Sequence, residues 1–252
     1  MYQANADLAH VLDVTARTLP GIPARVGVSA GDQLACGSDG NPARVAALYE
    51  HLQRSFPEAG AHYWTVRTWT LLIWQPIYLS LFGVHLAERA PCLDGMGQTV
   101  CDNMVYGFCL PEHCPRRATP HALIDFAAEQ VRTLVERQWQ DFDAVAGIHR
   151  KLARRLQADC VLGALLMIQR QQSLANERMH QLEHLWLEAL ELRGDSSLID
   201  VRLDDGRERL ALGRKVCCQH FRRSDGNYCS SCPKLKQEER LTRLRQELSL
   251  EC

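Results

Sequence analysis

Four cysteines close together near the end of the chain constrain its fold more than any other feature. They are Cys217, Cys218, Cys229 and Cys232, in the spacing C-C-x10-C-x2-C. The CxxC turn brings two thiolates to one side of a tight loop. The adjacent pair differs, because successive side chains of an extended backbone point to opposite faces. We therefore expect the chain to bend there, and the turn signal Ser-Asp-Gly-Asn at 224–227 to fold the loop back.

Three chemistries fit this spacing. A two-iron cluster takes four thiolates spread over two irons and would use every cysteine of the quartet. Zinc is normally bound by two CxxC-like pairs of cysteines, or by one such pair with histidines, and the quartet contains one CxxC pair. Four unligated thiols would behave as small apolar core residues, but Gln219, His220, Arg222 and Arg223 make this segment polar. The spacing favours iron and sulfur and leaves the other two interpretations open.

The motif and its surroundings resemble the ferric siderophore reductases of the FhuF type. Adjacent cysteines, ten residues and CxxC stand near the C-terminal end of this chain of 252 residues. As in that family, a hairpin-like stretch at 201–206 leads into the cysteines, and a Pro-containing apolar segment ends at 74–79. The resemblance implies that the quartet holds a [2Fe-2S] cluster. It also implies one-electron reduction of siderophore-bound Fe(III), with release of Fe(II).

Basic residues surround the quartet. Within residues 213–236 six lysines and arginines stand against the single acid Asp225. This excess of positive charge would offset a negatively charged cluster and would attract an acidic electron donor or an anionic ferric chelate. The basic side chains that we expect to act on a substrate or donor are Arg214, Lys215, Arg222 and Arg223.

Other sequence patterns bear on the partners. The sequence shows no Rossmann glycine fingerprint and no P-loop. We therefore expect an external electron donor, such as a ferredoxin or an NAD(P)H-dependent reductase, and a ferric siderophore of the hydroxamate type as substrate. An iron-sulfur electron carrier or sensor, or a zinc-stabilised binding module, is the alternative function. The formal charge of −1 argues against nucleic acid as a partner.

The rest of the chain predicts a mainly α fold of the α+β class, with short β-hairpins and the small C-terminal iron-sulfur motif. Helical periodicity dominates, and residues 100–110 contain β-prone pieces that predict a strand or hairpin. Thr119 and Pro120 are a plausible start for a long helical region. We expect a helical, chelate-binding body at 1–197, a β-hairpin with the cluster motif at 198–236 and a helical tail at 237–252.

Residues 62–87 form the most apolar part of the chain, and within them residues 69–87 are almost long enough to cross a membrane, for which about 20 apolar residues suffice. Pro76 interrupts this stretch, so we expect two core helices, kinked or broken there, and at most peripheral membrane association. The N-terminus does not resemble a secretory signal. Thiols that stay reduced favour metal binding over disulfides. The expected location is therefore the cytoplasm, including the inner face of the cell membrane.

The remaining candidates carry weaker patterns. An aromatic stripe within residues 64–78 predicts core packing, with contact to a siderophore at a cavity rim as the alternative. His180 and His184 share a helix face, but their order is not that of HExxH, so we expect surface histidines. Four further cysteines are spaced too widely to form a CxxC-like pair of metal ligands. We therefore expect them to be separate buried thiols, and we assign no role to them. These are Cys92, Cys101, Cys109 and Cys114.

Overall fold

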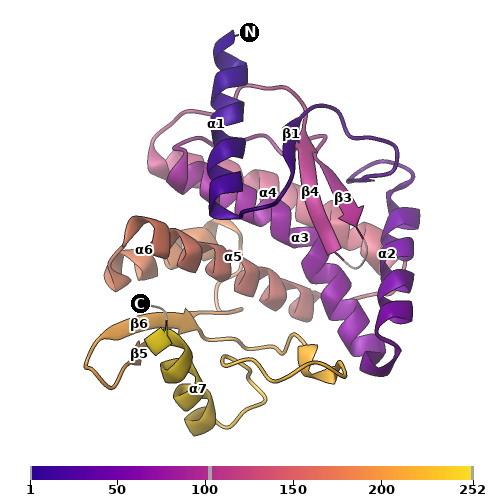
Figure 1. Ribbon diagram of the computed structural model, residues 1–252. Coiled ribbons are helices and arrows are strands. Elements are labelled where there is room, and N and C mark those ends of the chain that lie inside the picture. Colours follow the sequence, from indigo (N-terminus) through magenta and orange to yellow (C-terminus); the bar gives the residue numbers. More distant parts are fainter. Residues whose placement is uncertain (1, 102–103, 251–252) are drawn as a thin grey trace.

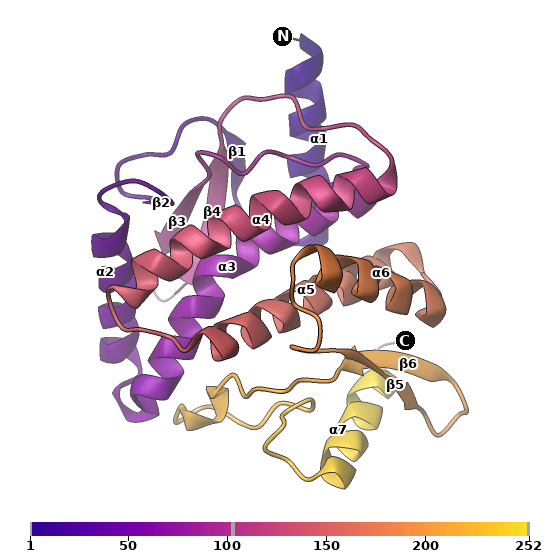
Figure 2. The same cartoon turned by 180° about the vertical axis from the view of Figure 1, so that it is seen from behind.

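The computed structural model describes residues 2–101 and 104–250, and it confirms the mainly α, α+β class (Figures 1 and 2). The helices are α1 (Tyr2–Thr18), α2 (Asn41–Ser55), α3 (Gly60–Leu86), α4 (Pro120–Asp143), α5 (Arg150–Gln172), α6 (Asn176–Ala189) and α7 (Gln237–Leu250), with the 3-10 turns η1 (Pro57–Ala59) and η2 (His220–Arg222). The strands are β1 (Ala24–Val26), β2 (Leu34–Ala35), β3 (Gly97–Cys101), β4 (Met104–Leu110), β5 (Leu198–Arg202) and β6 (Glu208–Leu212).

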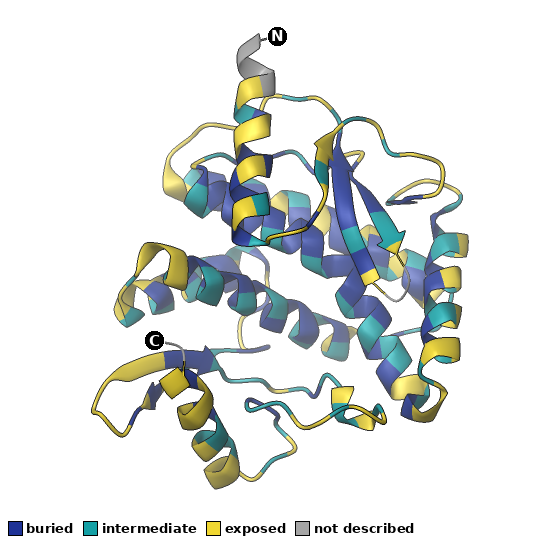
Figure 3. Cartoon of the chain, in the orientation of Figure 1, coloured by how far each residue is buried: buried dark blue, intermediate teal, exposed yellow. Residues whose placement is uncertain are grey.

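Helix α3 lies at the centre of the molecule. It packs against α1, α2, α4 and α5, and Figure 3 shows α3 and β4 as largely buried elements. By length and composition the stretch Pro57–Leu86 could cross a membrane, but 72% of its apolar window is buried inside the protein. Its apolar residues therefore form the core around which the other helices are arranged.

The prediction of two helices with a break at Pro76 is wrong, because α3 is one helix from Gly60 to Leu86 with Pro76 inside it. Proline has no N–H to donate to the carbonyl of Leu72, four residues earlier. The side-chain amides of Gln98 and Gln138 donate to that carbonyl instead, at 3.1 and 2.9 Å. Two buried amides, one from β3 and one from α4, thus replace the missing helical hydrogen bond.

A small sheet of order β1-β4-β3-β2 packs beside these helices. Strand β1 is parallel to β4, and the other pairs are antiparallel. The strand or hairpin predicted at 100–110 is confirmed by β3 and β4. The sequence did not reveal β1 and β2, because each has three residues or fewer and forms by pairing with strands 60 or more positions away.

The β5–β6 hairpin and α7 form the C-terminal part of the structure. Figures 1 and 2 show them grouped beside α5, with the loop after β6 running toward the N-terminal end of α3. The Arg243 guanidinium donates to the carbonyl of Tyr228 in the cysteine-bearing loop (3.1 Å), and Arg245 donates to the carbonyl of Arg202 in β5 (3.1 Å). Helix α7 and the hairpin share a small apolar core of Val201, Leu203, Ala211, Leu244 and Leu248.

The predicted division into body, hairpin with cysteine motif, and tail stays a prediction. Leu198 and Leu210 of the hairpin belong to the same apolar core as the helical body. The hairpin is therefore packed against the helices on one side and against α7 on the other. Residues 251 and 252 of the predicted tail lie outside the described residues.

Candidate metal centre

The loop that carries the quartet is shaped by two backbone features. Gln219 adopts a left-handed conformation with φ of +60°, which turns the chain directly after Cys218. At Gly226 the backbone passes so close to the carbonyl of His220 that any Cβ would collide with it. The rings of Phe221 and Tyr228 then stack at 4.5 Å and close the loop on itself. The bend expected at the adjacent cysteines is therefore present.

The loop gathers the four sulfurs in two pairs. The Sγ atoms of Cys217 and Cys232 lie 3.6 Å apart. The second pair is Cys218 and Cys229, whose thiols share a hydrogen bond. Two sulfurs on one tetrahedral metal, with bonds of about 2.3 Å, lie about 3.8 Å apart. In the described part of the chain no three Cys, His, Asp or Glu side chains converge on one metal position. Two pairs suit two metal ions rather than a single zinc ion.

The two pairs differ in burial and in proton affinity. Cys217 and Cys232 are buried, and burial raises the pKa of the Cys217 thiol to about 11. Cys218 and Cys229 are half-buried. The hydrogen bond from Cys229 lowers the pKa of Cys218, and the same bond raises the pKa of Cys229. Because the thiolate is the metal-binding form of cysteine, the lowered pKa of Cys218 favours the form of this residue that binds a metal.

Hydrogen bonds to sulfur come from the loop itself. The backbone N–H of Gln219 donates to Cys217 Sγ at 3.4 Å. The backbone N–H of His220 points to Cys218, where it helps to lower the pKa. The Ser231 hydroxyl lies 3.9 Å from Cys229 Sγ. Such hydrogen bonds stabilise negative charge on thiolates and thereby set the potential of an iron-sulfur centre.

The basic residues predicted around the quartet have partners that the sequence does not reveal. Arg223 makes a bidentate ion pair with Asp225, at 2.7 and 2.5 Å. Arg214 Nε lies 3.9 Å from Oδ2 of Asp159, a residue of α5, and burial raises the pKa of that carboxyl to about 6. Arg222 donates to the side chain of Gln219. Of these partners only Asp159 is an acid from outside residues 213–236, so its carboxylate alone reduces the local positive charge below a count along that segment.

An open cavity of about 460 Å³ lies beside Cys218. Its walls come from α3, α5 and the segment after β6, and they bring together residues far apart in the sequence. Arg214 lines this cavity, whereas Lys215 lines a different one. The residues that α3 contributes are Tyr63, Arg67, Thr70, Trp74 and Tyr78.

A second cavity, of about 620 Å³, lies beside Cys217. It is mostly apolar, with Val66, Leu152 and Val216 in its walls and lysines at its edge. The two adjacent cysteines thus line two different cavities, because the turn at Gln219 comes after them and does not bring their side chains together. The quartet therefore borders two separate openings of the protein.

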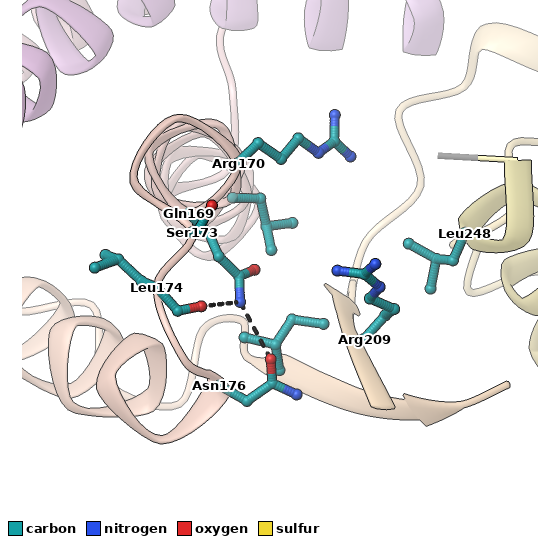
Figure 4. A pocket seen from close by; sticks show the side chains of 9 residues that line it. Gln169, Arg170, Ser173, Leu174, Asn176, Arg209 and Leu248 are labelled. Carbon is teal, nitrogen blue, oxygen red and sulfur yellow. Dashed lines mark hydrogen bonds between the residues drawn. The ribbon is translucent and has the colours of Figure 1, made fainter. Parts of the chain in front are cut away.

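A third cavity, of about 490 Å³, opens between α5, α6, β6 and α7 (Figure 4). Figure 4 shows Arg170 and Arg209 at its edge and the Gln169 amide donating to Asn176 and to the carbonyl of Leu174. Neither a cysteine nor any predicted site residue lines it. We therefore do not assign it to the metal centre.

The weaker candidates lie away from the quartet. His180 is hydrogen-bonded to Glu183 and Asp200, and His184 contacts Arg193 and Glu188, so both take part in polar contacts within their own part of the surface. The four upstream cysteines do not converge. Their expected burial holds for Cys109, which is buried, and Cys92 is half-buried, whereas Cys101 and Cys114 are exposed.

Sequence reasoning left the residues of the cavity beside Cys218 unnamed. Tyr63, Arg67, Thr70, Trp74 and Tyr78 follow one another at intervals of four, three, four and four, which is one face of a continuous helix. The aromatic stripe expected from the sequence runs through Trp64, Trp69, Trp74 and Tyr78, so Tyr63, Arg67 and Thr70 were not recognised as part of this face. Of the predicted aromatic stripe, Trp69 is buried in the core, as expected, whereas Trp74 and Tyr78 line the cavity.

The donor set defines the class of protein. Four thiols in two pairs, with backbone and hydroxyl donors to sulfur, fit a [2Fe-2S] centre, which takes two protein ligands on each iron. Residues 214–234 match the family model described as the FhuF 2Fe-2S C-terminal domain. The match includes all four cysteines, so it confirms both the resemblance and the [2Fe-2S] cofactor. The C-terminal segment, residues 214–234, is therefore similar to the FhuF 2Fe-2S C-terminal domain. No solved structure matches the chain.

Proposed function

We propose that this protein is a ferric siderophore reductase, which reduces siderophore-bound Fe(III) by one electron and releases Fe(II). The observation that carries the proposal is the position of Cys218. This cluster ligand lies in the wall of an open cavity that is large enough for much of a small chelate. An iron-sulfur centre that only stored or sensed electrons would have no need of such a cavity.

The chemistry requires little beyond electron supply and binding. When bound, a [2Fe-2S] cluster with four thiolates supplies single electrons at about −400 mV. Hard oxygen ligands hold Fe(II) less tightly than Fe(III), so reduction favours release of the metal. A general acid or a nucleophile is not required. The chain must therefore hold the chelate close to the sulfurs and exclude water from between them.

The residues of the cavity are suited to these tasks. Trp74 and Tyr78 provide flat apolar surface for the organic part of a chelate. Arg67 and Arg214 place guanidinium groups in the same walls, where they can donate hydrogen bonds to carbonyl or anionic oxygens of the ligand. Bound there, the chelate would lie against the Cys218 side of the quartet.

The electron must come from another molecule, because the sequence has no evident site for a nicotinamide or a flavin. We propose a ferredoxin or an NAD(P)H-dependent reductase as the donor. We also propose that the protein works in the cytoplasm, at most in peripheral contact with a membrane. Reduced cysteines and an internal supply of reductant support this location.

The test compares two tryptophans in similar settings. Trp74 donates to the carbonyl of Val105 at 3.2 Å and lines the cavity, and Trp139 donates to the carbonyl of Ile148 at 3.3 Å and does not. Fe(II) release from ferric hydroxamates is measured with a chromogenic Fe(II) chelator and a photoreduced deazaflavin as reductant. We expect Trp74→Ala to raise KM about tenfold, because one stacking surface is lost.

We expect Trp139→Ala to leave KM near the wild-type value, and both variants to keep the visible spectrum of the cluster. Equal changes of KM in both variants would show that the chelate does not bind in the cavity beside Cys218. If the wild-type cluster is reduced but releases no more Fe(II) than apoprotein does, the protein is an electron carrier or sensor instead.

A further inference from the structure

We infer that the cavity beside Cys217 is the docking surface for an electron-carrier protein with an acidic face. This inference rests on the proposed function, since it concerns the source of the electron. The adjacent cysteines line different cavities. A chelate bound beside Cys218 leaves the opening beside Cys217 free. Donor and acceptor can therefore approach the same centre from two sides without competing for one site.

The rim of this cavity is basic. Its charged or titratable lining residues are His62, His149, Lys215 and Lys234, all exposed, and no Asp or Glu lines it. Lys215 Nζ donates to the carbonyl of Gly194 at 2.5 Å, and Lys234 Nζ lies 5.6 Å from the centre of the Phe221 ring. These partners are neutral, so both ammonium charges remain. Within the described residues neither lysine is ion-paired to a carboxylate.

The interior of the cavity is apolar. Val66, Ile148, Leu152, Val216 and Pro233 contribute to its walls. An apolar centre within a polar, charged rim is the usual organisation of a protein–protein interface. A small anion would gain nothing from the apolar walls, whereas a protein side chain can fill them. A basic rim also steers an acidic partner toward the surface and accelerates encounter at low ionic strength.

The position of Cys217 gives this surface a role in electron transfer. Its side chain lines the cavity although the residue is only 8% exposed. A carrier seated on the rim would therefore approach the buried sulfur pair, Cys217 and Cys232, through one thin layer of protein. The basic residues on the other side, Arg214 and Arg223, face Asp159 and Asp225 and are less available to an acidic partner.

The experiment uses the full chain with its cluster and a plant-type [2Fe-2S] ferredoxin as the acidic probe. The variants are Lys215→Glu/Lys234→Glu and a control with the same charge change, Arg178→Glu/Arg209→Glu, at exposed sites that do not line this cavity. Stopped-flow absorption gives the rate of cluster reduction by the reduced ferredoxin. Rates with photoreduced neutral deazaflavin correct for any change in the cluster, and calorimetric titration gives the Kd of the oxidised ferredoxin.

We expect the corrected rate of reduction by ferredoxin to be about tenfold lower in the lysine variant. We also expect this rate to depend much less on the salt concentration than the wild-type rate does. The Kd should rise by a similar factor. The control should lose less than about twofold, because its charges lie outside the interface. Equal losses in both variants, or no loss in either, would overturn the inference. The proposed function is tested separately by the reduction of ferric chelates by wild-type protein whose cluster has been reduced with deazaflavin, because this reaction needs no carrier protein.

Discussion

Cys217 and Cys218 are adjacent in the chain, yet the sulfur of Cys217 lies 3.6 Å from that of Cys232, while Cys218 is hydrogen-bonded to Cys229. The pairing is therefore nested: the first cysteine pairs with the last, and the two middle ones pair with each other. This arrangement divides the ligands between a buried pair and a half-buried pair. One cysteine of each pair lines a cavity, Cys217 the one and Cys218 the other.

The nested pairing predicts which substitutions affect the same iron. We expect Cys217→Ser and Cys232→Ser to change one iron of the cluster, and Cys218→Ser and Cys229→Ser to change the other. Mössbauer and EPR spectra of the one-electron-reduced protein provide the measurement, because the ferrous and ferric irons give separate signals. Two matching pairs of spectra are expected. Spectra that group Cys217 with Cys218 would contradict the pairing.

Gly226 is predicted to be required for cluster assembly. A Cβ at this position would collide with the carbonyl of His220, so the ten-residue loop must open to accept any other residue. We expect Gly226→Ala to retain less than about half of the wild-type iron and sulfide after reconstitution, because an overpacked site shifts its backbone. The matched control is Gly31→Ala, where an added Cβ meets nothing. A fully loaded Gly226→Ala protein would show that the loop is more adaptable than the structure indicates.

The bond pattern at Pro76 predicts coupling between this residue and Gln138. Replacing Gln138 by Leu removes one donor to the Leu72 carbonyl and should cost about 1–3 kcal/mol in the free energy of unfolding. In a Pro76→Ala background the helix can donate its own N–H to that carbonyl, so the same replacement should cost less. Urea unfolding of the four proteins gives the coupling, which we expect at about 1 kcal/mol. Additive costs would mean that the amides do not replace the helical bond.

His85 is predicted to make the protein sensitive to mild acid. Trp186 Nε1 donates to His85 Nε2 at 2.8 Å, and burial lowers the pKa of this imidazole from 6.5 to about 4. The unfolded chain takes up a proton near pH 6.5 and the folded chain only near pH 4. Stability from this group is therefore present at pH 7.5 and lost as the pH falls through this window.

The expected loss between pH 7.5 and pH 5 is about 2 kcal/mol in the free energy of unfolding, by linkage. His85→Gln keeps an acceptor for the indole but cannot be protonated. Urea unfolding at both pH values should therefore show a smaller acid effect in this variant, by about the same 2 kcal/mol. An unchanged pH dependence would assign the effect to other groups.

The sequence was sufficient where structure depends on neighbouring residues. The hairpin turn at 204–206, the helix start at Thr119 and the bend at the adjacent cysteines all follow from local rules, and the structure contains them. The quartet could be recognised because its four cysteines lie within 16 residues. A centre assembled from distant ligands would have left no such pattern.

The sequence was insufficient where distant residues decide. Helix α3 continues through Pro76 because Gln98 and Gln138 supply donors from 22 and 62 positions further along the chain. The charge near the quartet depends on Asp159, which belongs to α5 and reaches Arg214 only in the folded protein. The two cavities likewise combine α3 with segments that follow its end by about 60 residues or more.

Helix α7 has a practical consequence for anyone who handles this protein. Its leucines are packed into the hairpin core, and its Arg243 holds the cysteine-bearing loop at Tyr228. A purification tag or fusion partner joined directly after this helix would pull on the same support that keeps the sulfurs in register. Colourless preparations of such fusions would then reflect lost contacts between α7 and the cysteine-bearing loop rather than an inability to bind iron. A tag placed before α1 is the safer choice.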